Sequence, residues 1–83
     1  MIKQALDMIK SFLNGKYEAL AFSYDFPEFL IENYDEMEKE NTIVTDILND
    51  NMPEICSEYE IGQPFDEFKQ KTKVEYDKAK EYA

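Results

Sequence analysis

The chain has 83 residues, with nineteen Asp and Glu against nine basic residues and a formal net charge of −10. It contains no His, no Trp and no Arg, so all nine basic residues are Lys. The lack of His removes the commonest general base and metal ligand. The lack of Arg removes the usual bidentate phosphate ligand. The negative charge argues against direct binding to nucleic acid or to an anionic membrane surface.

The composition indicates one small domain spanning residues 1–83. Hydrophobic residues make up 43% of the chain, including six Phe and six Tyr, which is too many for a disordered segment. Two Gly and three Pro are few for a many-stranded β fold. The single Cys cannot form an internal disulfide. The first residues resemble neither a signal peptide nor a membrane span, so we expect a cytoplasmic protein.

Apolar spacing predicts two helices in the first half of the chain. Ile2, Leu6, Ile9 and Leu13 recur every three or four residues, which predicts a helix over 2–14 that Gly15 ends. A second helix is predicted over 18–39. Its apolar face carries Phe22, Phe26, Phe29, Leu30, Asn33, Tyr34 and Met37. Pro27 lies inside this pattern and either kinks one long helix or begins the second of two pieces.

Two further helices are predicted in the second half. Asn41 and Thr42 are suitable caps for a helix over 42–60. The apolar pattern continues across Pro53, which favours a kink there, although the poor helix formers at 49–51 leave a local turn as the alternative. Gly62 and Pro64 mark a connector before a last helix over 64–80. Four amphipathic helices with short connectors predict an all-α fold, a small antiparallel four-helix bundle.

The excess negative charge is confined to the middle of the chain. Residues 17–62 hold thirteen acids and one base, Lys39, for a net charge of −12. An ordinary solvated helix face mixes both signs. Unpaired like charges at i,i+4 also weaken a helix slightly. Beside the simple interpretation as a solvated face, we therefore favour a surface that binds a basic partner. Its candidate residues are Asp25, Glu28, Glu32, Asp35, Glu36, Glu38, Asp46, Asp50, Glu54, Glu58 and Glu60.

The sequence does not indicate an enzyme, a cofactor or a metal site. Di-iron bundles require Glu-x-x-His pairs, and EF-hand loops require a central Gly that the acidic stretches lack. Cys56 is in phase with Met52 and Tyr59, so we expect a buried thiol and not a reactive one. Tyr34 and Tyr59 are expected at the edge of the core. Other Tyr residues are candidate interface anchors.

Two short segments resemble the colicin D-type immunity proteins of bacteria. One comprises Phe12-Leu13-Asn14-Gly15-Lys16, followed by Ala19 and Phe22-Ser23; the other is Glu54-Ile55-Cys56 with the tail Glu58-Tyr59-Glu60-Ile61-Gly62. The resemblance implies a small helical antitoxin that binds a toxin's nuclease domain in the cytoplasm. We expect the free protein to be a monomer and the complex to contain one copy of each chain. In that family the toxin cleaves tRNA and the acidic immunity protein covers its basic active site.

Two other functions remain open from the sequence. Rows of carboxylates are also typical of a nucleic-acid mimic that inhibits a host DNA-binding protein. A non-inhibitory helical adaptor is the third possibility, for which an apolar patch would dominate an interface insensitive to salt.

Overall fold

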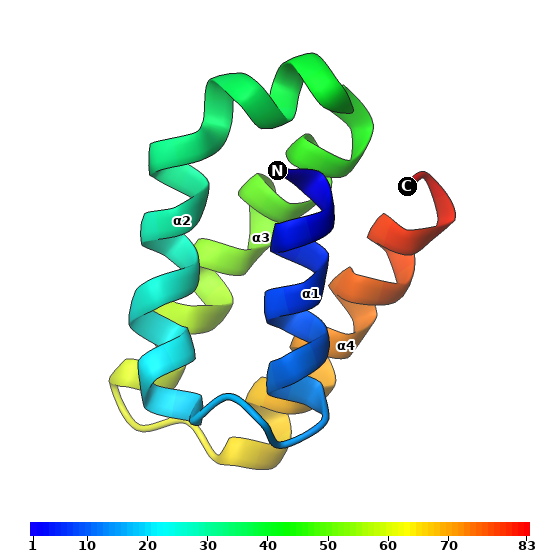
Figure 1. Ribbon diagram of the computed structural model, residues 1–83. Helices are drawn as coiled ribbons and strands as arrows, with labels where there is room; N and C mark the ends of the chain where they lie inside the picture. The colour runs from blue at the N-terminus through cyan, green and yellow to red at the C-terminus, as the bar shows by residue number, and fades with distance from the viewer.

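The computed structural model describes residues 1–83 and contains four helices and no strands. They are α1 (Ile2–Leu13), α2 (Ala19–Glu40), α3 (Thr42–Glu60) and α4 (Phe65–Glu81). Each helix packs against the next along the chain, and α4 closes the ring by packing against α1 (Figure 1). The predicted antiparallel four-helix bundle is therefore confirmed, with every helix boundary within one residue of its predicted place.

Local signals in the sequence set these boundaries. Gly15 and Gly62 adopt positive φ angles of 77° and 111° and turn the chain after α1 and α3. The carboxylate of Glu18 accepts hydrogen bonds from the backbone N–H groups of Leu20 and Ala21. Asn41 caps α3 as predicted, because its Oδ1 accepts a hydrogen bond from the Val44 N–H at 3.1 Å.

Both internal prolines lie within continuous helices. Pro27 is inside α2 and Pro53 is inside α3, so neither helix breaks into two pieces and no separate turn forms at 49–51. A proline has no N–H, and each therefore removes one helical hydrogen bond, to the carbonyls of Ser23 and Asn49. Phe26 and Met52, the residues before the two prolines, are fully buried, so core packing offsets the lost hydrogen bond at both places.

An aromatic cluster forms the core near the end of the bundle that holds the two longer connectors. The Phe12 and Phe22 rings stack with centroids 4.5 Å apart, and Phe68 lies 4.7 Å from Phe12. Tyr59 stacks on Phe68 at 4.6 Å, which confirms its expected place at the edge of the core. Aliphatic side chains extend the core toward the other end; they are Leu30, Met37, Val44, Leu48 and Met52.

Polar contacts fasten the end of the bundle where both termini lie (Figure 1). The N-terminal amino group lies 3.0 Å from Oε2 of Glu40, and Oε1 of Glu40 accepts the Ile2 N–H at 3.1 Å. Asn41 donates from Nδ2 to the carbonyl of Tyr82 at 2.7 Å. The turn between α2 and α3 thus ties the beginning of α1 and the end of α4 together.

Candidate functional site

The outer side of α2 carries a row of exposed carboxylates. At about 100° per residue they fall within an arc of about 100°, away from the buried face of the helix; they are Asp25, Glu28, Glu32, Asp35 and Glu36. None of the four ion pairs in the molecule involves them, and Lys39 takes part in none either. This row is the unneutralised part of the acidic segment.

One member of the row contacts the preceding connector. The Tyr17 hydroxyl donates a 2.6 Å hydrogen bond to Oδ2 of Asp25. Burial and this carboxylate raise the pKa of Tyr17 to about 12. Tyr17 also packs edge-on against Phe22, so the contact fixes Asp25 relative to the aromatic core.

A second group of acids meets between the C-terminal half of α2 and the beginning of α3. Asp46 and Asp50 are exposed, and Glu38 is half-buried beside them. Burial and the Asp46 carboxylate raise the pKa of Glu38, whose Oε2 atom is screened from solvent and accepts no hydrogen bond. Tyr34 lies among these groups, and its pKa is raised chiefly by Glu38. Tyr34 is 37% exposed and is not among the side chains packed against the core, so the prediction that it lies at the core edge is wrong.

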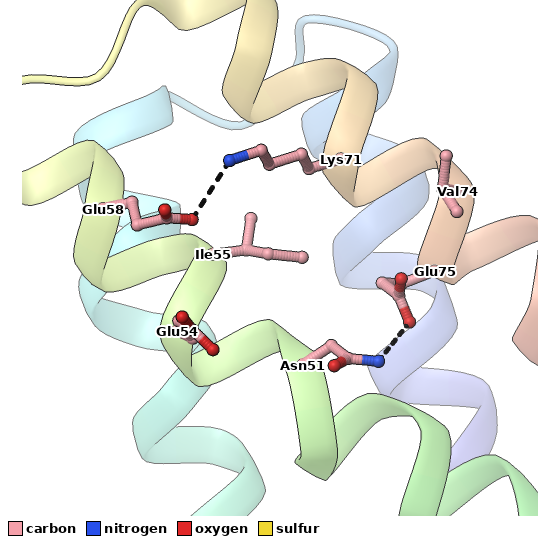
Figure 2. Close-up of a pocket in the computed structure, with 7 residues that line it drawn as sticks. All are labelled: Asn51, Glu54, Ile55, Glu58, Lys71, Val74 and Glu75. Atoms are coloured by element: carbon pink, nitrogen blue, oxygen red, sulfur yellow. Dashed lines mark hydrogen bonds and ion pairs between the residues drawn. The ribbon is translucent and has the colours of Figure 1, made fainter.

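The predicted row of acids on α3 divides into two parts. A step of four residues advances about 40° around a helix, so the row turns from α2 toward α4. Glu54 and Glu58 line a cleft of about 360 Å³ with Lys71 and Glu75 of α4 (Figure 2). Lys71 Nζ lies 3.3 Å from Oε1 of Glu58. The acids at 54 and 58 therefore belong to a different surface from Asp46 and Asp50.

The last candidate, Glu60, is exposed at the C-terminal end of α3. Burial of the Cys56 thiol raises its pKa to about 12, and the negative charge of Glu60 contributes to this rise. Cys56 is fully buried, which confirms the prediction of a thiol in the core.

The structure also assembles a basic surface that the sequence did not predict. Two clefts between α1 and α4 are lined by more lysines than acids. Asp7 and Asp77 lie there too, and Asp77 pairs with Lys73 at 3.1 Å. The lysines are Lys3, Lys10, Lys69, Lys73 and Lys80. This edge of the bundle is opposite the edge that α2 and α3 share, because the helices follow one another in a ring. Only the packing of α4 against α1 brings the two sets of lysines together.

The burial of Glu75 is a second feature that the sequence did not predict. Its side chain lies inside the cleft between α3 and α4, where Asn51 Nδ2 donates to Oε1 at 2.9 Å (Figure 2). Lys78 Nζ lies 3.2 Å from its Oε2. Because both oxygens have a partner, Glu75 connects the two helices and does not present a free charge.

No group of three or more Asp, Glu, Cys and His side chains has the geometry to hold a metal ion. No helix has the length and apolar character needed to cross a membrane. No protein-family model, curated protein or solved structure matches the chain. The resemblance to colicin D-type immunity proteins therefore stays a prediction from short sequence segments.

Proposed function

We propose that this protein is an immunity protein, a cytoplasmic, non-enzymatic inhibitor that binds and neutralises a toxin nuclease. The nuclease is a basic RNase that cleaves tRNA, and one free monomer of this chain binds one nuclease domain. The acidic surface of α2 and the beginning of α3 covers the basic cleft in which the nuclease binds its RNA. We define this acidic surface as Asp25, Glu28, Glu32, Asp35, Glu36, Glu38, Asp46 and Asp50.

The observation that carries the proposal is the row of carboxylates on α2 that form no ion pair. Its five members are exposed and lack any lysine partner within the molecule. Repulsion between these carboxylates slightly lowers the stability of the free protein. A basic partner removes that repulsion and supplies the missing counter-charges. A field of one sign also speeds encounter with an oppositely charged partner.

The geometry narrows the set of predicted contact residues. Glu58 is paired with Lys71, and Glu54 lies in the same cleft toward α4, so we leave both out of the proposed contact surface. Glu60 is exposed but lies at the far end of α3 from Asp46. We retain Asp46 and Asp50 from α3 because they lie near Tyr34 of α2, where their charges help to raise the pKa of its hydroxyl.

The test is recovery of the partner and assay of its activity. The tagged chain is purified from its native cells, the bound protein is released with denaturant, and after refolding it is assayed on total tRNA. The proposal predicts a basic protein that cleaves tRNA and is silenced by one equivalent of this chain. Recovery of a DNA-binding protein with no nuclease activity would favour the nucleic-acid mimic instead. Recovery of a partner whose activity the chain does not inhibit would favour the adaptor.

A further inference from the structure

An apolar ridge runs along the outside of α2 beside the acidic row. It consists of Leu20, Tyr24, Ile31 and Tyr34, which are 44%, 56%, 78% and 37% exposed. Half-buried Pro27 continues the same line. The five positions are spaced by four, three, four and three residues, so they lie within an arc of about 80°. We call the four exposed side chains the α2 ridge.

The α2 ridge is not part of the core of this domain. The buried face of α2 consists of Phe22, Ser23, Phe26, Leu30 and Met37. Scattered apolar side chains are normal on any protein surface. Four large ones that follow one another over about 21 Å of a single helix form a continuous stripe. This is the pattern by which one helix packs against another.

Carboxylates border the α2 ridge on both sides. Glu28 and Asp35 follow it on α2 by helical phase, about 60–80° around the axis from Leu20. On the other side Asp46 and Asp50 of α3 lie close enough to Tyr34 to affect its hydroxyl, and Glu38 lies at the end of the stripe. A segment that covers the α2 ridge therefore meets carboxylates of α2 along one edge and, beside Tyr34, carboxylates of α3 at the other edge.

We propose that the α2 ridge docks an amphipathic helix of a basic protein, with apolar residues at spacings of three and four and Lys or Arg along both flanks. The inference rests on the proposed function only in that the partner is basic. It adds that an apolar centre holds the complex together while the acidic surface guides its approach. In interfaces of this kind, a few large side chains that become buried on binding supply most of the binding energy. Tyr24 and Tyr34 are the candidates for this role on the α2 ridge.

The charges disfavour the other ways of covering the stripe. A second copy of this chain that docked through its own α2 ridge would bring two acidic borders against each other. An anionic lipid surface would meet the same repulsion. A basic helix is the occupant that satisfies both the apolar stripe and its borders.

The experiment uses the full chain and a synthetic helical peptide of 21 residues. The peptide carries Leu at three-four spacing on one face and Lys on both flanks. A control peptide has the same composition in scrambled order. Binding is measured by fluorescence anisotropy for the wild type, for the double variant Tyr24→Ser/Ile31→Ser, and for Val74→Ser. Val74 is a matched control because it is 54% exposed on α4, outside this surface. Thermal unfolding verifies that each variant is folded.

The patterned peptide is expected to bind at least about tenfold more tightly than the scrambled one, and the double variant to lose about tenfold. Val74→Ser should stay within about twofold of the wild type. Equal binding of the two peptides, or unchanged binding by the double variant, overturns the inference. So does a wild-type dimer in sedimentation that the double variant abolishes, since a second copy would then cover the stripe. A recovered nuclease combined with a failed peptide result would remove this inference and leave the proposed function standing. If the peptide bound as expected but no nuclease were recovered, the proposed function would fail and the inference about the α2 ridge would stand.

Discussion

Lys71 of α4 and Glu58 of α3 form an ion pair, with 3.3 Å between Nζ and Oε1. This contact marks where the acidic surface ends, because it neutralises a carboxylate that the sequence groups with Asp50. The two acids are two helical turns apart on α3, yet one faces α4 and the other lies near Tyr34 of α2. Their contributions to partner binding should therefore differ.

Neutralising each acid in turn tests this division. Asp50→Asn should slow association with the recovered nuclease by about threefold at about 0.1 M salt, because it removes one charge from the guiding field. Glu58→Gln removes the same charge from the side that faces α4, and screening over about 10 Å at this salt concentration should make its effect on the association rate smaller. Stopped-flow fluorescence measures both rates. Equal slowing by the two variants would show that the whole α3 row acts as one surface.

The aromatic cluster should dominate the stability of the fold. Phe12 is buried and contacts both Phe22 and Phe68, so Phe12→Ala leaves a cavity among three helices. The expected loss is about 3–5 kcal/mol of unfolding free energy, a large part of the roughly 5–15 kcal/mol of a small domain. Urea unfolding measures it. Leu20→Ala is the control, since that side chain is exposed, and it should change stability by less than about 0.5 kcal/mol.

Much of this fold could be predicted from sequence, because its helices begin and end at local signals. Asn41, Gly15 and Gly62 act through their own backbone neighbours, so the sequence alone indicates them. The α2 ridge could not be predicted in the same way. Helix α2 has two apolar stripes, and only its packing against α1 and α3 decides that Phe26 is buried while Ile31 is exposed.

The candidate site was predicted less completely than the fold. The unpaired acids of α2 lie outside the core as their phase required. The partner of Glu58, the burial of Glu75 and the shared lysine clefts each depend on contacts between helices far apart in sequence. Helical phase alone places such residues on a face but does not say which helix lies opposite.

Glu38 and Glu40, near the end of α2, should change the stability of the protein in opposite directions as the pH changes. The pKa of Glu38 is raised by burial and by Asp46, so its contribution is present below the pKa of the unfolded chain and is lost as the pH rises through the folded value. The pKa of Glu40 is lowered by the Ile2 N–H and the N-terminal amino group, so its contribution is present at neutral pH and is lost as the pH falls.

Thermal melts between about pH 3 and pH 7 distinguish the two groups. Glu38→Gln should be more stable than the wild type at neutral pH, and Glu40→Gln less stable. Both differences should shrink toward the acidic end, as the wild-type carboxylates take up protons. A constant difference across the pH range would mean that neither effect arises from ionisation.

The Cys56 thiol should be inert in the folded protein. Its pKa of about 12 leaves on the order of a thousandfold less thiolate than an ordinary cysteine has. Reaction with a thiol reagent at pH 8 should therefore be slower by at least that factor than in denaturant, where one thiol per chain reacts. A native rate close to the denatured one would place Cys56 outside the core.

The central claim is that the acidic surface of α2 inhibits the nuclease, and one matched pair of variants tests it most directly. Glu28→Lys/Glu32→Lys/Asp35→Lys reverses three charges on α2, and Asp66→Lys/Glu67→Lys/Glu81→Lys reverses three exposed acids of α4. Both variants have the same net charge. The concentration needed to inhibit tRNA cleavage should rise about 100-fold for the α2 variant and stay within about threefold of the wild type for the α4 variant. Equal inhibition by the two variants would contradict the account.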